Sequence, residues 1–183
     1  MTLYSMRDAV RLPGLISLAR LPLALAFPWV MKSPAAAIVL LILAAVTDVL
    51  DGWTARRRHE VTPTGAALDA LMDKIFVLVV AFALVLGGSL TVLEAILLGT
   101  RDLGELPLLT RLALQHRLAS RRPLGSNVAG KLATVLQFAT LVAILLGTPH
   151  REIWIFVTSV CGALAATTYW IREGHSEGAW SPR

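Results

Sequence analysis

The chain has 183 residues, of which 56% are hydrophobic and 16% charged, with 17 Lys and Arg against 12 Asp and Glu. Its mean hydropathy of +0.68 is higher than that of an ordinary soluble domain, and its apolar runs are long enough to cross a bilayer. This composition argues against a soluble all-helical protein, and a single cysteine excludes a disulfide framework. We therefore expect an all-α integral membrane protein.

Six apolar segments predict six transmembrane helices in one membrane domain over residues 13–171. They cover residues 13–30, 35–55, 65–86, 90–112, 128–146 and 152–171. Residues 1–12 are expected to form a short amphipathic helix on the membrane surface, with a frayed tail as the alternative. A C-terminal tail is expected at 172–183. Three of the connections are short and contain Gly or Pro, whereas those at 55–64 and 115–127 are longer and basic.

Basic residues gather on one side of the predicted membrane domain. The N-terminal segment, the two long loops and the tail hold eleven arginines, whereas the opposite loops hold only Lys32 and Arg151. By the positive-inside rule, both termini and both long loops are expected in the cytoplasm, most simply at a bacterial cytoplasmic membrane. This placement accounts for the net positive charge without a nucleic-acid partner.

Four aspartates stand at the facing ends of the second and third predicted helices. Asp48 and Asp51 are three residues apart, and Asp69 and Asp73 are four apart, so each pair lies on one helix face. The intervening loop reverses the chain, which allows the two pairs to meet. Clustered carboxylates repel unless cations hold them, and oxygen ligands favour Mg²⁺ or Mn²⁺. Four carboxylates are enough for two metal ions, a common arrangement for displacement at phosphorus; a proton or cation pathway is the other functional interpretation.

Small residues accompany the aspartates on the same helix faces and leave room for a ligand to approach the backbone. They could equally serve only to pack membrane helices closely. The full pattern, called here the aspartate signature, reads Asp48-x2-Asp51-Gly52-x2-Ala55-Arg56-x8-Gly65-x3-Asp69-x3-Asp73.

The aspartate signature resembles, at every fixed position, that of the CDP-alcohol phosphotransferase family. The resemblance implies a six-helix membrane fold, usually a homodimer, with a cytoplasmic active site that holds two divalent cations. It implies transfer of a substituted phosphate from a CDP-linked donor to an alcohol, with release of CMP. The metal ligands would be Asp48, Asp51, Asp69 and Asp73, with Asp73 also the catalytic base. The residues lining the nucleotide pocket would be Gly52, Ala55, Arg56 and Gly65.

Further segments resemble the phosphatidylglycerophosphate synthase branch of that family. These are the stretch PGLISLARL, which includes Arg20, the pair Arg101-Asp102, and the segment Gly130-Lys131-x2-Thr134-x2-Gln137. The resemblance implies that Arg101 and Lys131, with Arg111 third, bind the phosphate of a phosphorylated acceptor. The expected donor is CDP-diacylglycerol and the expected acceptor is glycerol 3-phosphate, with inositol phosphate and phosphatidylglycerol as alternatives. The chain departs from that branch at Asp69-Ala70, where Asp-Pro is common, and at Arg101-Asp102, where Arg-Glu is usual.

Other interpretations of these residues remain open. The aspartates could serve a divalent-cation transporter, or the chain could be an inactive membrane scaffold. Arg101 could pair with Asp102 or Glu105 for structural reasons, and Lys131 could simply extend to the membrane interface. The sequence assigns no role to Glu94, and Arg20 could mark only a later start of the first helix.

Overall fold

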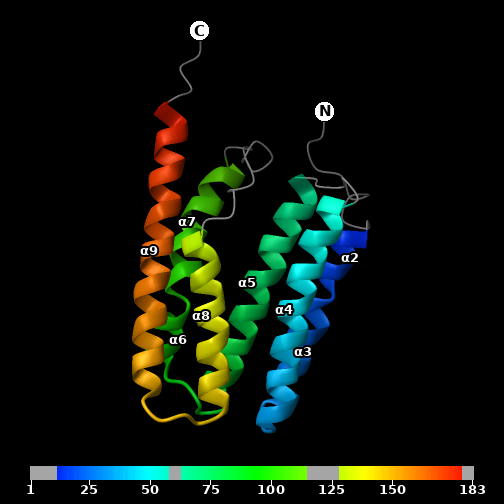
Figure 1. Ribbon diagram of the computed structural model, residues 1–183, viewed down its shortest axis with the longest axis vertical. Coiled ribbons are helices and arrows are strands. Elements are labelled where there is room, and N and C mark those ends of the chain that lie inside the picture. Colours follow the sequence, from blue (N-terminus) through cyan, green and yellow to red (C-terminus); the bar gives the residue numbers. More distant parts are fainter. Residues whose placement is uncertain (1–11, 58–62, 115–127, 179–183) are drawn as a thin grey trace. The chain divides into compact units, whose positions relative to one another are not determined.

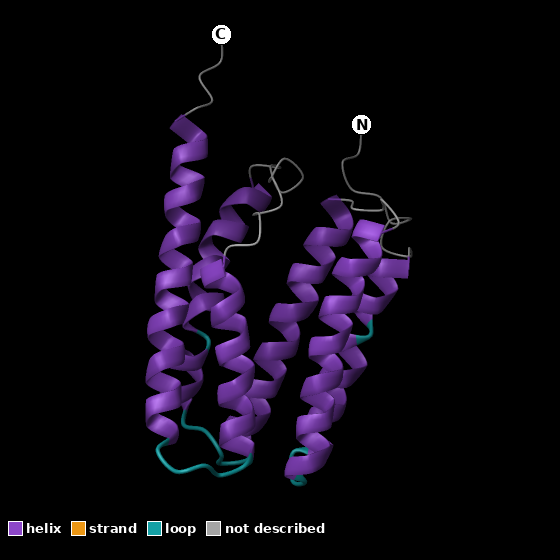
Figure 2. Ribbon diagram, viewed as in Figure 1, coloured by secondary structure: helices purple, strands orange, loops and turns teal. Residues whose placement is uncertain are grey.

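The computed structural model describes residues 12–57, 63–114 and 128–178, and all regular secondary structure there is helical (Figures 1 and 2). The all-α prediction is confirmed for these residues. The predicted surface helix lies outside them except for Leu12, as do the central part of the first basic loop and the whole of the second.

The described helices coincide with the six predicted apolar segments, but two segments are divided. The helices are α2 (Leu12–Leu18), α3 (Arg20–Val30), α4 (Pro34–Arg57), α5 (Pro63–Leu86), α6 (Val92–Leu98), α7 (Thr100–Leu114), α8 (Val128–Leu145) and α9 (Arg151–Gly178). The first segment is divided at Ala19 and the fourth at Gly99. Helix α9 also continues into the predicted tail, as far as Gly178.

These helices form two compact units, α2–α5 and α6–α9. In the first unit, α3 packs against α5 and α2 packs against α4. Its core includes the fully or almost fully buried residues Ala24, Phe27, Ala37, Leu41, Phe76, Val80 and Leu84. Alanines among the larger side chains allow the helices to approach closely.

In the second unit, α9 packs against α6, α7 and α8. Two buried hydroxyls join α8 to α9, because the Oγ1 atoms of Thr140 and Thr158 are 2.7 Å apart. Glycines permit the close contact of α7 with α9: a Cβ atom on Gly162 would lie 3.1 Å from the Arg101 backbone nitrogen. Pairing of polar side chains inside each unit leaves largely apolar outer faces, on which large hydrophobic residues from Leu15 to Ile171 are exposed.

Within the described ranges, two helical segments are long and apolar enough to cross a membrane, Pro34–Ala55 and Arg151–Ile171. Only 28% and 33% of their most apolar stretches are buried inside the protein, whereas the core helix of a soluble protein is mostly buried. Gly14–Val30 and Gly130–Leu145 are shorter apolar helices. These findings agree with a membrane protein; the number of six crossings and the single domain over 13–171 stay predictions.

Glycine ends both α5 and α8 in the way that the sequence indicates. Gly88 and Gly147 have φ values of 72° and 63°, in the left-handed region that glycine adopts without strain. After α5, the Ser89 N–H donates to the Leu84 carbonyl at 2.9 Å and the Gly88 N–H donates to the Val85 carbonyl at 3.0 Å. This is the hydrogen-bond pattern of a Schellman cap, which confirms the turn predicted at 87–89.

Glu94, which the sequence left without a role, forms an ion pair within the second unit. Its Oε1 lies 3.4 Å from Nη2 of Arg151, so the pair connects α6 with the first turn of α9. Partly exposed ion pairs contribute little to stability. This pair therefore provides control variants for changes at the charged residues of the candidate site.

We predict that Gly104→Ala destabilises the second unit. The added Cβ would lie 2.7 Å from the Ala166 Cβ, which cannot rotate away, and overpacking of this kind costs about 1–3 kcal/mol. Thermal unfolding of the purified protein in detergent should show a lower midpoint. Gly99→Ala is the matched control, because its Cβ would meet its nearest neighbour at an ordinary 3.4 Å. Equal midpoints for the two variants would contradict the close α7–α9 packing.

Candidate metal centre

The site begins with two polar residues one helical turn apart at the junction of α2 and α3. The Ala19 N–H donates to the carbonyls of Leu15 and Ile16, both at 3.1 Å, so the chain remains nearly helical across the junction. Ser17 and Arg20 therefore share one face. Their exposed fractions are 2% and 1%, which places a hydroxyl and a guanidinium inside the first unit.

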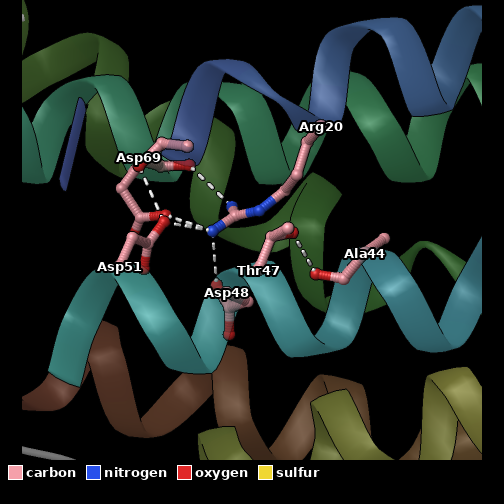
Figure 3. A network of polar contacts seen from close by, with 7 residues as sticks. Arg20, Ala44, Thr47, Asp48, Asp51 and Asp69 are labelled. Atoms are coloured by element: carbon pink, nitrogen blue, oxygen red, sulfur yellow. Dashed lines mark hydrogen bonds and ion pairs between the residues drawn. The ribbon is translucent and has the colours of Figure 1, made fainter. Parts of the chain in front are cut away.

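Arg20 extends from α3 to carboxylates on both α4 and α5 (Figure 3). A single nitrogen, Nη2, lies 2.6 Å from Oδ2 of Asp51, 2.8 Å from Oδ1 of Asp69 and 3.0 Å from Oδ1 of Asp48. The other terminal nitrogen, Nη1, donates to the Asp69 backbone carbonyl at 3.5 Å. We call Asp48, Asp51 and Asp69 the aspartate cluster.

The aspartate cluster is fixed on one side and accessible on the other. Asp51 is 3% exposed, and its Oδ2 also accepts a hydrogen bond from the Ser17 hydroxyl at 2.7 Å. The side chains of Asp48 and Asp69, in contrast, are 48% and 41% exposed. The hydroxyl of Thr47 bonds within its own helix, to the Ala44 carbonyl, and so does not occupy the cluster (Figure 3).

The donor set of the aspartate cluster fits a hard divalent cation. One carboxylate oxygen from each residue lies within 4.8 Å of the other two, and Mg²⁺ and Mn²⁺ prefer such oxygen ligands. Three carboxylates outnumber one guanidinium, so these four side chains carry a net negative charge when ionised. The convergence of three oxygens on a guanidinium nitrogen shows that the cluster already accommodates a positive group.

The structure describes the surroundings of some of the remaining signature residues but not of all. Asp73 lies one turn beyond Asp69 on α5 and is half-buried, but it is not part of the 4.8 Å group. Its roles as metal ligand and base stay predictions. Gly52 and Ala55 are half-buried on α4, next to the cluster in sequence. Arg56 and Gly65 belong to α4 and α5, and their surroundings lie outside the described residues.

The second unit brings the two leading acceptor-phosphate candidates to one place. Arg101 on α7 donates from Nη1 to the Thr134 hydroxyl on α8, and Thr134 lies one turn from Lys131. Lys131 is exposed, whereas the Arg101 Nε is buried and has no hydrogen-bond partner among the described residues. Arg111, the third candidate, is on α7 with its side chain outside the described residues.

Asp102, the neighbour of Arg101, contacts a different residue of α8. The Gln137 amide donates to Oδ2 of Asp102 at 2.9 Å and to the Leu98 carbonyl at 3.3 Å. Both side chains are buried. The hydrogen bond of Arg101 thus goes to Thr134 and not to Asp102 or Glu105, the structural partners that the sequence offered. Thr134 and Gln137, two residues of the Gly-Lys-x2-Thr-x2-Gln segment on α8, thus form hydrogen bonds with side chains of α7.

Sequence reasoning missed Ser17 and left Arg20 without a role, although both face the aspartate cluster. The available signal was Arg20 itself, because an arginine inside an apolar segment is costly unless it has partners. Its spacing of three from Ser17 placed both residues on one helix face. The identity of their partner carboxylates becomes visible only when α3 packs beside α4 and α5.

The sequence matches the CDP-alcohol phosphatidyltransferase family over residues 10–170. The chain belongs to this family. The match includes the aspartate cluster and Arg20 on the first unit and Arg101 and Lys131 on the second. It confirms the resemblance and shows that the chain is a phosphatidyltransferase enzyme of phospholipid biosynthesis in membranes.

Named relatives include two kinds of transferase. The chain is 29% identical over 158 residues to a CDP-diacylglycerol–glycerol-3-phosphate 3-phosphatidyltransferase of Yersinia pestis (strain Pestoides F), covering 86% of this chain and 84% of the relative. The protein of the same name from Yersinia enterocolitica is 30% identical, with 85% and 83% covered. A putative cardiolipin synthase of Mycobacterium bovis is 31% identical over 82% of this chain and 71% of its own.

We predict that Asp51→Asn weakens Mn²⁺ binding more than any change outside the cluster. Asp51 is the most buried of the three carboxylates and is held by two donors, whereas an amide offers no negative charge. Ser17→Ala, which removes one of these donors, should weaken binding by about tenfold, as expected for a group that orients a ligand. Electron paramagnetic resonance of free Mn²⁺ in titrations of the detergent-solubilised protein measures both effects.

Glu94→Gln is the control for this titration, because Glu94 is an acid paired with Arg151 in the other unit. It should bind Mn²⁺ as the unchanged protein does. Equal Mn²⁺ affinity of Asp51→Asn and Glu94→Gln would show that the aspartate cluster is not the metal centre.

Proposed function

We propose that this chain transfers the phosphatidyl group of CDP-diacylglycerol to glycerol 3-phosphate, forming phosphatidylglycerophosphate and releasing CMP. The observation that carries the proposal is the convergence of Asp48, Asp51 and Asp69 within 4.8 Å, inside a complete aspartate signature. The names of the Yersinia relatives support the acceptor. Because the family is one of enzymes, the cation-transporter and inactive-scaffold alternatives are set aside.

The aspartate signature would hold two divalent cations, Mg²⁺ or Mn²⁺, through Asp48, Asp51, Asp69 and Asp73. Such ions, when bound, neutralise the charge on phosphate oxygens and on the departing nucleotide. Gly52, Ala55, Arg56 and Gly65 would line the nucleotide pocket. Ser17 would keep Asp51 in position through its hydrogen bond to Oδ2, so that the geometry of this ligand is set before the substrate arrives.

In the reaction, the acceptor hydroxyl attacks the phosphorus that carries diacylglycerol. A new oxygen–phosphorus bond forms, the bond from that phosphorus to the CMP oxygen breaks, and the hydroxyl proton passes to the Asp73 carboxylate. This role requires Asp73 to reach the hydroxyl by a hydrogen bond. Its place one turn after Asp69 puts the base next to the ligands on the same face of α5.

Arg101 and Lys131 would bind the phosphate of the acceptor, with Arg111 as a third candidate. Two features support this assignment. Arg101 donates a hydrogen bond to Thr134, one turn from Lys131, and the buried Nε of Arg101 has no partner in the part of the chain that the structure describes. A phosphate oxygen would satisfy that donor in a charge-assisted hydrogen bond. A homodimer with its active site and both termini in the cytoplasm completes the proposal.

We predict that the purified protein releases CMP from CDP-diacylglycerol with Mg²⁺ or Mn²⁺ when glycerol 3-phosphate is present. Inositol phosphate and phosphatidylglycerol, offered separately, should give much less CMP. Asp73→Asn should abolish release because an amide cannot accept the proton, whereas Glu94→Gln should retain it. Release with phosphatidylglycerol alone would instead assign the chain to cardiolipin synthesis, and release undiminished in Asp73→Asn would overturn the role of the base.

We predict that Arg101→Gln raises the KM for glycerol 3-phosphate by about tenfold or more, since hydrogen bonds to charged groups contribute about 1.5–3 kcal/mol. The KM for CDP-diacylglycerol should change little. Arg151→Gln removes an arginine from the same unit and serves as the control. Steady-state kinetics with each substrate varied in turn make the comparison, and an equal rise in both KM values would argue against an acceptor-phosphate site.

A further inference from the structure

Arg20 occupies the position in the aspartate cluster that a bound cation would need. Its Nη2 is 2.6–3.0 Å from one oxygen of each of the three carboxylates, and the same three residues would hold the proposed metal. Metal–oxygen bonds are about 2.0–2.6 Å for Mg²⁺ and Ca²⁺. A nitrogen in contact with all three oxygens therefore competes with an ion for the same space and the same negative charge.

The negative charge of the three carboxylates holds the Arg20 guanidinium, although not all of its N–H groups have hydrogen-bond partners among the described residues. Among the described residues, Nη1 and Nη2 have partners, whereas Nε is buried and has none. A group placed only to brace the helices would be expected to pair every buried N–H. The contacts are thus concentrated on the one nitrogen that faces the carboxylates, as Figure 3 shows.

Asp51 has a second donor that does not depend on Arg20. The Ser17 hydroxyl bonds the same Oδ2 that accepts from Nη2. Asp48 and Asp69 have side chains open to solvent on about half of their surface. Asp51 can therefore keep its position when the guanidinium withdraws, and an ion can reach the exposed side chains of Asp48 and Asp69.

We propose that Arg20 is a tethered cation, which neutralises the aspartate cluster in the metal-free protein and is displaced from its oxygens by the divalent ion. This inference rests on the proposed metal site. Two consequences follow. Arg20 stabilises the protein before metal binds, and it weakens metal affinity, because the ion must first displace an attached competitor.

The test compares Arg20→Gln with the unchanged full-length protein, both in detergent and freed of metal with a chelator. Arg20→Gln should unfold at a lower temperature without metal, and saturating Mn²⁺ should restore most of the loss. Paramagnetic resonance should give a Mn²⁺ dissociation constant that is lower by about tenfold or more. A neighbouring charge changes the proton affinity of a carboxylate by a similar factor. The thermal shift on adding Mn²⁺ should be correspondingly larger.

Arg20→Lys and Arg151→Gln are the controls. The lysine keeps the positive charge and should keep most of the metal-free stability and the weaker Mn²⁺ binding. Arg151→Gln removes an arginine from a pair outside the cluster and should change neither quantity. If Arg20→Gln folds only with Mn²⁺ present, the inference is supported, since the ion then replaces the missing charge. If it fails to fold even with Mn²⁺, the inference is overturned.

The outcomes separate this inference from the proposed function. If the unchanged protein binds Mn²⁺ and Arg20→Gln binds it equally or more weakly, Arg20 is not a competitor and the inference alone fails. If the unchanged protein does not bind Mn²⁺ at all, or if Asp51→Asn binds it equally well, the proposed metal site fails and the inference fails with it.

Discussion

The attraction between one buried guanidinium and three carboxylates determines how α2–α5 can pack. At contact distance, two like charges repel by about 4 kcal/mol at the effective dielectric constant of a protein surface. Asp51 on α4 and Asp69 on α5 can therefore both be ionised in one site only if a cation lies between them. Arg20, in turn, can be 1% exposed only because acids surround it. Each element of the unit thus depends on the charges of the others.

The aspartate cluster has one enclosed carboxylate and two exposed ones. Asp51 is enclosed and held by donors from the α2–α3 segment, whereas Asp48 and Asp69 have side chains that remain partly exposed. An enclosed ligand fixes where an ion lies, and exposed ligands let water or a phosphate oxygen complete its coordination. On the proposed function both properties would be needed, because the donor substrate would approach the ion through its own phosphates.

The helices were predictable because their apolar segments are long and uniform. The C-terminal end of α5 was predictable from Gly87-Gly88. The pairing of Asp48 and Asp51 with Asp69 followed from helical spacing and a reversing loop. The divisions at Ala19 and Gly99 were not predictable, since neither position carries a proline. Beside Gly99, the Thr100 hydroxyl lies 2.6 Å from the Leu97 carbonyl and 3.4 Å from the Ile96 carbonyl. A threonine hydrogen bond to the carbonyl four residues back, as to Ile96, often bends a helix.

The partners of single charged residues were also beyond prediction from the sequence. Arg20, Glu94 and Arg101 each contact side chains 28 or more positions away, so spacing along one helix says nothing about them. A lone arginine in an apolar segment indicates that a partner exists, but only helix packing identifies it. The aspartate signature was readable because its four aspartates lie on two helices that follow each other in the sequence.

The same reasoning explains how one family can serve different acceptors. This chain is similar over more than four fifths of its length both to glycerol-3-phosphate phosphatidyltransferases and to a putative cardiolipin synthase. On the proposed function, donor chemistry resides in the aspartate signature of α4 and α5, and acceptor recognition resides in Arg101 and Lys131 of α7 and α8. Carboxylates that hold metal ions tolerate little change in spacing, whereas a phosphate-binding arginine can move by a turn or be replaced without disturbing them. On that proposal, the departure at Arg101-Asp102 would bear on which alcohol is accepted and would leave the metal centre untouched.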